Sequence, residues 1–213
     1  LSVLHIHTFL ICDTKLTDEA AAAMAPLLPH LTRLQFKSTR SEVISNKGLV
    51  HFAQCTKLTA LGLVGLSIED DAVIAMVSAC PNLLYVDISN CPSLTDRSLV
   101  AIAANNPLLE RLYMHTNGNF SPAGLGAIAS HSKHLDTLHC ANCFSITGEC
   151  IVNLMQKCPN MCALYLDCAH PTHRLSEADL VSVLQHGGKL VKLCLFSPTL
   201  TYRLLSTIST HCS

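Results

Sequence analysis

The sequence predicts an α/β solenoid, a right-handed β-α superhelix in which every unit contributes one strand and one helix. One pattern recurs along the chain, with copies beginning near residues 1, 31, 58, 83, 109, 135, 161 and 190. A fixed period between about 20 and 50 residues is typical of stacked-repeat proteins. Each copy opens with alternating apolar residues and closes with an apolar run at helical spacing. Stacked copies would build a curved parallel sheet on the concave face and a helical layer on the convex face.

The clearest copy spans residues 83–109. It opens with an apolar triad that includes Val86 and Ile88, continues through Cys91 and the triplet Leu-Thr-Asp, and ends in an apolar helical run before Asn-Pro. Because side chains alternate in a strand, Val86 and Ile88 should point inward, whereas Asp87 and Ser89 should point outward.

The first two units are looser copies. In unit one, Leu1, Leu4 and Ile6 predict the strand, residues 19–28 predict the helix, and Asp18 is expected to be its N-cap. In unit two a strand around residues 31–36 is followed by a polar connection and a helix that closes at Cys55.

The later units follow the reference copy closely. The helix of unit three is expected to begin at Asp70 or Asp71 and to end at Cys80, because Pro81 cannot continue it. Unit seven carries an insertion at residues 169–174, and unit eight ends in a helix-like tail at residues 202–208. No linker interrupts the copies, so we expect a single domain over residues 1–213 that is a fragment of a longer chain.

The composition supports an ordered protein and argues against two kinds of partner. The 213 residues are 49% hydrophobic and 14% charged, which is ample material for a core. The longest apolar-looking stretch, residues 20–28, is broken by Pro26 and is far shorter than the roughly 20 residues that span a membrane. A formal net charge of −1, without a basic cluster, disfavours nucleic-acid binding. We therefore expect neither a membrane nor a nucleic-acid partner.

The 12 cysteines are expected to be mostly reduced. Disulfide frameworks belong to short secreted chains that cannot build a core, and this chain builds one by stacking. Cys55 and Cys80 hold similar helix-end places in adjacent units, where packing is favoured over a disulfide. These features predict a reducing compartment, the cytoplasm or the nucleus.

The units resemble leucine-rich repeats of the cysteine-containing class found in F-box proteins. The motifs are LLYVDISNCPSLTDRSL at 83–99, LTD at 16–18, CPNLLYV at 80–86, CANCFSITGECI at 140–151 and CPNMCALYL at 158–166. The resemblance covers essentially the whole chain. It implies a leucine-rich repeat solenoid and a recognition module, often the substrate receptor of a Skp1-cullin-type ubiquitin ligase. No F-box-like segment lies within these residues, so a Skp1-type adaptor would bind a segment outside this chain.

A structural metal is an alternative interpretation of some cysteines. Cys140 and Cys143 form a C-x2-C pair, but the repeat register gives them the inward place of Ile88 and the turn place of Cys91. We therefore predict no metal and no cofactor. The residue types that remain suitable for zinc lie at the unit-seven insertion, and they are Cys168, His170 and His173.

An enzymatic function is not predicted. His115 and His139 fall at outward positions of adjacent units, so they should lie close together. They are better interpreted as binding-surface residues than as acid–base catalysts, because a regular sheet offers no enclosed pocket. No nucleophile elbow or phosphate-binding loop occurs in the sequence.

The outward strand positions predict a binding surface in the middle of the array. Tyrosine and arginine are enriched among the residues that dominate protein interfaces. The predicted partner-binding residues are Tyr85, Asp87, Arg111, Tyr113, His115, His139, Tyr165 and Asp167. The alternative is a solvated strand face with incidental aromatic residues.

Two functions are compatible with such a surface. The first is substrate recognition for an SCF-type ubiquitin ligase. The second is a structural scaffold subunit of a large cytoskeletal, axonemal or other multiprotein assembly.

Overall fold

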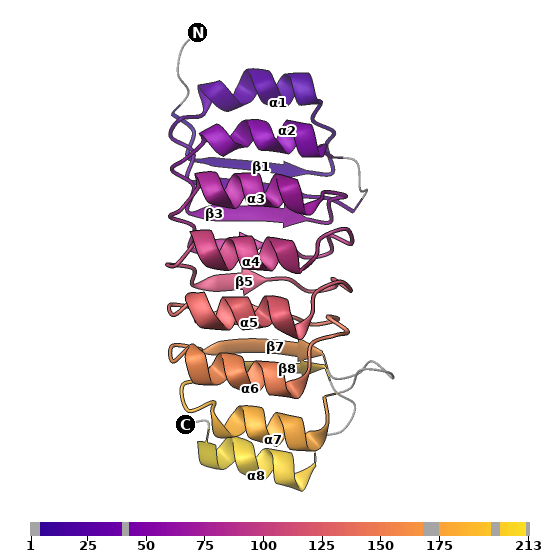
Figure 1. The fold of residues 1–213 in the computed structure, drawn as a ribbon, viewed down its shortest axis with the longest axis vertical. Helices are drawn as coiled ribbons and strands as arrows, with labels where there is room; N and C mark the ends of the chain where they lie inside the picture. Colours follow the sequence, from indigo (N-terminus) through magenta and orange to yellow (C-terminus); the bar gives the residue numbers. More distant parts are fainter. Residues whose placement is uncertain (1–4, 40–42, 168–174, 197–200, 212–213) are drawn as a thin grey trace.

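Strands and helices alternate along the chain in two layers (Figure 1). The computed structural model describes residues 5–39, 43–167, 175–196 and 201–211, apart from the side chains of Asp167 and Phe196. Within these residues eight strands form one parallel sheet in chain order. They are β1 (Thr8–Cys12), β2 (Arg33–Lys37), β3 (Ala60–Val64), β4 (Tyr85–Asp87), β5 (Arg111–Tyr113), β6 (Thr137–His139), β7 (Ala163–Asp167) and β8 (Lys192–Phe196).

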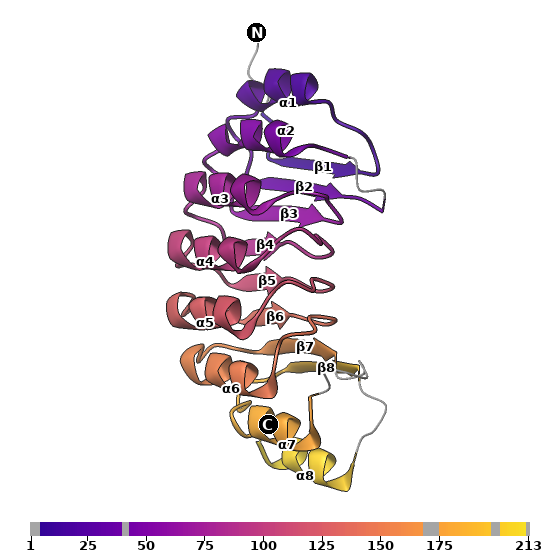
Figure 2. The ribbon, with the colours of Figure 1, turned by 45° about the vertical axis from the view of Figure 1, so that its right-hand side comes forward.

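The helices cover one face of the sheet and leave the other face open (Figure 2). They are α1 (Asp18–Met24), α2 (Asn46–Val50), α3 (Asp70–Ala79), α4 (Asp96–Asn105), α5 (Pro122–His131), α6 (Gly148–Lys157), α7 (Glu177–Gln185) and α8 (Tyr202–His211), with 3-10 turns at Ala25–Leu27 and His51–Gln54. The predicted fold class is therefore confirmed.

The core lies between the two layers and is built from equivalent residues of successive units. Leu61, Val86 and Leu112 are neighbours in one ladder across β3, β4 and β5, and all three are fully buried. Each such ladder removes apolar surface from water only when units stack, so stability depends on neighbouring units.

The first unit is offset from its predicted position. The prediction placed a strand on Leu1, Leu4 and Ile6, but β1 begins at Thr8 and pairs with β2 at a spacing of 25 residues, Thr8 with Arg33. Residues 1–4 lie outside the described residues. This register directs Phe9 inward, where its ring centroid lies 6.1 Å from that of Phe52. Phe9 thus packs near an aromatic ring of the next unit.

The helix starts are joined by a ladder of acidic side chains. Asp18 was predicted to cap α1, but Thr17 is the N-cap, and Asp18 instead accepts a hydrogen bond from the next unit. The same arrangement recurs at three interfaces, Asp18 with the Ser45 hydroxyl at 2.7 Å, Asp70 with Thr95 at 2.6 Å and Asp96 with Ser121 at 2.5 Å. Each acceptor also lies in the first turn of its own helix, where negative charge is favoured.

A second ladder joins the helix ends. Cys80, which follows α3, donates its thiol to the backbone oxygen of Cys55 at 3.6 Å, as the packing interpretation predicted. Cys158 makes the same kind of bond to the preceding unit at 3.4 Å. Asn106 takes this place after α4 and donates its amide to the oxygen of Cys80 at 2.7 Å.

A third ladder of hydrogen bonds joins the turns that follow the strands. Cys91 donates its thiol to a carbonyl of the preceding unit at 2.8 Å, and Cys143 does so at 3.0 Å, so the C-x2-C pair is explained by repeat packing. Asn90 and Thr116 sit in this turn with positive φ, 56° and 60°. Ser89 was predicted to point outward, but it is completely buried beneath the turn.

Candidate functional site

The predicted binding residues come together on the open face of β4 to β7. Strand pairing places Tyr113, His139 and Tyr165 side by side in one ladder, because the units stack in register. Tyr85 lies in the adjoining ladder, opposite Arg111. The side chain of Asp167, the eighth predicted residue, lies outside the described residues.

The aromatic side chains form a continuous surface across four strands. Ring centroids are 5.4 Å apart between Tyr85 and Tyr113, 5.7 Å between Tyr113 and His139, and 4.9 Å between His139 and Tyr165. His115 adds a fifth ring at 4.6 Å from His139, as the sequence predicted for this histidine pair. These separations fall within the range of favourable ring pairing. We call these five residues the aromatic surface.

Two cations lie over the ends of the aromatic surface. The Arg111 guanidinium is 5.6 Å from the ring centroid of Tyr85, and the Lys192 ammonium is 5.1 Å from that of Tyr165. Both distances suit cation–π attraction. Lys192 is absent from the predicted set of binding residues, although it holds the same outward strand position as Arg111. The strand position that Lys192 shares with Arg111 is the sequence signal that would have predicted Lys192 as a binding residue.

Asp87 is hydrogen-bonded to Tyr85 of the aromatic surface. It is only 9% exposed, and it accepts hydrogen bonds from the Tyr85 hydroxyl and from the Ser89 backbone, both at 3.1 Å. Strand pairing places it on the outward face opposite Tyr113, as predicted, but neighbouring side chains bury it there. Asp87 therefore orients Tyr85 more than it offers a free carboxylate.

Burial favours the uncharged forms of four side chains of the aromatic surface, Tyr85, Tyr113, His115 and His139. It lowers the pKa of His115 and His139, although the negative charge of Asp87 opposes the shift. Burial also raises the pKa of Tyr113, and at Tyr85 the charge of Asp87 and their hydrogen bond raise the pKa further. The cations of this region are Arg111 and Lys192, and Asp87 is a buried carboxylate beside them.

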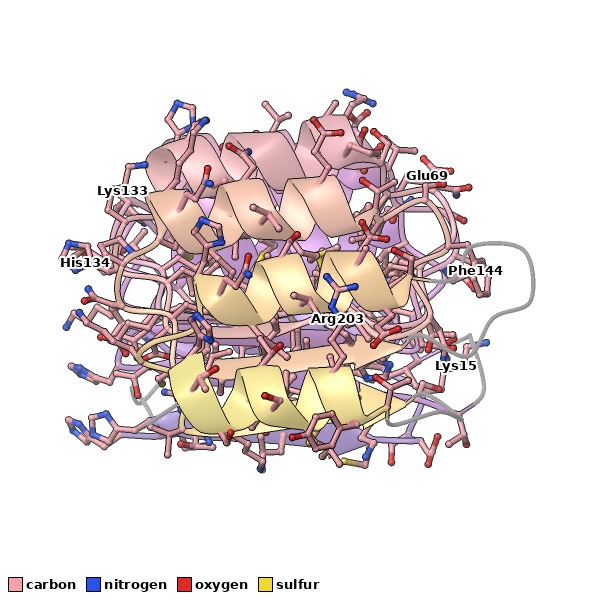
Figure 3. The ribbon with its side chains drawn as sticks, turned by 90° about the horizontal axis from the view of Figure 1, so that it is seen from below. Lys15, Glu69, Lys133, His134, Phe144 and Arg203 are labelled. Atoms are coloured by element: carbon pink, nitrogen blue, oxygen red, sulfur yellow. The ribbon has the colours of Figure 1, made fainter. Side chains whose placement is uncertain are left out.

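The edges of the solenoid carry other polar groups, away from the aromatic surface. Figure 3 shows Lys133 and His134 on one edge and Glu69 and Phe144 on the opposite edge. The Lys133 ammonium donates to the carbonyl of Ala129 near the end of α5 at 2.9 Å, where a cation favours the helix terminus. Lys133 therefore serves a helix end rather than the open face.

The three residues that were considered as alternative zinc ligands have no described position. Cys168, His170 and His173 lie outside the described residues, as does the insertion at 169–174. Among the residues that the structure describes, no group of three or more His, Cys, Asp or Glu side chains is arranged to hold a metal ion. Within the same residues, no helix is long and apolar enough to cross a membrane.

Comparisons with known proteins agree with the fold. No protein-family model matches the chain. A curated relative, F-box/LRR-repeat protein 4 of Bos taurus, is 24% identical over 162 residues, which cover 74% of this chain and 26% of the relative. The chain thus spans about a quarter of the length of that relative.

Solved structures give the same architecture. A chain of the yeast Rad7–Elc1 complex matches with a TM-score of 0.59 and 17% identity, over 99% of this chain and 60% of that one. An internalin of Listeria monocytogenes matches with a TM-score of 0.61 and 16% identity, over 94% and 57%. Actin-binding site 2 of leiomodin-1 matches with a TM-score of 0.52 and 16% identity, over 65% and 84%. The period, the parallel sheet and these similarities together identify the fold as a leucine-rich repeat solenoid, and the chain is similar in sequence to an F-box/LRR-repeat protein.

Proposed function

We propose that this chain is a protein-recognition module that holds a partner against its aromatic surface, and that it selects substrates for an SCF-type ubiquitin ligase. The aromatic surface is the observation that carries the proposal. Tyr113, His139 and Tyr165 lie on three adjacent strands, remain partly exposed, and are held in place by their neighbours. Rings fixed before binding lose little conformational entropy when a partner docks.

The composition of this surface fits a protein partner. Tyrosine supplies a large contact area with few rotatable bonds, and both tyrosine and arginine are enriched at interface hot spots. The similarity to F-box/LRR-repeat protein 4 supports the ligase role, with a Skp1-type adaptor bound by a segment outside this chain. The free thiols of the described cysteines are compatible with the cytoplasm or the nucleus.

Loss of binding after removal of two rings tests the recognition role. The variant Tyr85→Ala/Tyr113→Ala truncates neighbouring rings of the aromatic surface, and Tyr202→Ala truncates an 88% exposed tyrosine on α8 as a matched control. Quantitative affinity purification from cells that express the full-length protein should yield partners that are lost only from the double variant. A partner set that is the same in all three proteins would refute the proposal.

The ligase role has a separate test. A substrate should accumulate, and its half-life should lengthen, when the double variant replaces the wild type, while a Skp1-type adaptor co-purifies with both proteins. The scaffold function predicts instead a partner of constant abundance and no bound adaptor. Failure of the full-length protein to bind any such adaptor would favour the scaffold.

A further inference from the structure

The described strands carry four Lys or Arg side chains on the open face of the sheet, Arg33, Lys37, Arg111 and Lys192, and three of them fall in one ladder. Arg33, Arg111 and Lys192 occupy the same position in β2, β5 and β8, so successive cations are three strands apart. All three are exposed. Strands are spaced about 4.8 Å apart, which separates these positions by about 14 Å. The cations therefore form a row along the axis of the solenoid.

Among the side chains that the structure describes, no carboxylate forms an ion pair with this row. Among the described side chains of the strands, the carboxylate on this face is Asp87, which is buried and already accepts hydrogen bonds. The ion pair found within the described residues joins Arg97 and Asp71 on the helical side. Arg111 lies against an aromatic ring, and such a contact attracts a cation without cancelling its charge.

Some cations on the helical side and at the edges of the solenoid have local acceptors. Arg97 donates to Asp71 at 2.8 Å, and Lys133 donates to a helix-end carbonyl at 2.9 Å. Within the described residues, the concave row makes neither kind of contact. Its uncompensated charge is available to a ligand of opposite charge.

We propose that the concave face binds an extended acidic segment of a partner protein, running along the solenoid axis with carboxylates over the row of cations and apolar side chains against the aromatic surface. An extended chain advances about 3.4 Å per residue, so acidic residues about four positions apart would match neighbouring cations. The inference rests on the proposed recognition function and specifies the chemistry of the partner.

Selection from a phage-displayed library of random 16-residue peptides tests this chemistry. Peptides enriched on the 213-residue chain should be rich in Asp and Glu, with acidic residues about four positions apart. Binding of the enriched peptides, measured by fluorescence anisotropy, should weaken as salt rises from 50 to 500 mM, because exposed charge pairs are screened.

Two charge-reversal variants, one on the concave row and one outside it, provide the test and its matched control. Arg111→Glu/Lys192→Glu should weaken binding of the acidic peptides by about tenfold or more, which corresponds to about 1.4 kcal/mol. The control is Lys57→Glu/Arg203→Glu, which exchanges the same residue types on exposed positions outside this face; Arg203 lies on α8 (Figure 3). Both variants shift the formal net charge from −1 to −5, so a general charge effect would appear in both.

The outcomes separate the two proposals. The proposed acidic partner is wrong if the enriched peptides require Tyr85 and Tyr113 but show no excess of Asp and Glu. It is also wrong if these peptides bind Arg111→Glu/Lys192→Glu as tightly as the wild type. In both cases the proposed recognition function is retained. If no peptide is enriched above the level found on the Tyr85→Ala/Tyr113→Ala variant, both proposals are wrong.

Discussion

Asp70 and Asp71 are adjacent carboxylates in the first turn of α3, and we expect their removal to have very different effects. Asp70 is 6% exposed and accepts four hydrogen bonds from the next unit. Two come from Thr95, the backbone at 2.9 Å and the hydroxyl at 2.6 Å, and two come from Ser98, at 3.2 and 2.5 Å. Asp71 faces solvent, with its side chain 79% exposed, and pairs with Arg97 at 2.8 Å.

The magnitudes follow from these surroundings. Hydrogen bonds to a charged group contribute about 1.5–3 kcal/mol each, and Asp70→Ala leaves four donors without their acceptor. Partial rehydration and non-additivity reduce the sum, so we expect the free energy of unfolding to fall by about 3–5 kcal/mol. Asp71→Ala breaks an exposed pair and should cost at most about 0.5 kcal/mol. Any helix-dipole contribution is common to both variants and cancels.

Urea unfolding followed by far-UV circular dichroism measures the difference. Asp70→Ala should lower the midpoint strongly, and it can also broaden or split the transition, because the lost bonds join two repeats of a one-dimensional array. Asp70→Asn retains one acceptor oxygen and should fall between the wild type and Asp70→Ala. If Asp70→Ala and Asp71→Ala unfold at the same midpoint, the acidic ladder does not stabilise the stack.

The same carboxylate predicts a pH dependence. Burial alone would raise the pKa of Asp70, but hydrogen bonds from Ser98 and Thr95 outweigh it and lower the pKa below the ordinary value. A depressed folded-state pKa contributes stability that is fully present above the unfolded pKa of about 3.9 and is lost as pH falls through the folded value. The stability difference between wild type and Asp70→Asn should therefore be constant above about pH 5 and shrink below it. A difference that grows on acidification would contradict this reasoning.

Further predictions concern single residues. Thr116 is β-branched at φ 60°, a strained backbone conformation for this residue type, so Thr116→Asn should raise the free energy of unfolding by about 1 kcal/mol. If chemical denaturation shows no increase in this free energy, the strain is absent. Asn106→Ala loses two hydrogen bonds to the preceding unit and should cost about 2–3 kcal/mol, whereas Asn106→Cys, the residue of equivalent helix ends, should recover part of it. Burial raises the pKa of Cys91 to about 11, so iodoacetamide at pH 8 should alkylate exposed Cys12 well before Cys91 by mass spectrometry. Because burial lowers its pKa, His139 should titrate below about 6.5 by NMR, and stability should decline as pH falls through that range.

The strand positions of units two to eight were predictable from the sequence. Alternation of apolar residues and the spacing between copies are local signals, and stacking preserves both because each unit meets only its neighbours. The same alternation placed Tyr113, His139 and Tyr165 on one face, and strand pairing confirms that they are neighbours. Their role in binding remains a prediction.

The sequence by itself determined the repeat period, the fold class and which strand residues share a face, since these depend on periodicity. Only the tertiary structure decided which residues of neighbouring units a given side chain contacts and how deeply it is buried. Phe9 packs near Phe52 of the next unit, and Asp18 bonds to the next unit instead of capping its own helix. Asp87 is buried and accepts the hydroxyl of Tyr85. Such choices follow from contacts between residues that are one unit apart in the chain, or from burial by surrounding units, and no local pattern encodes them.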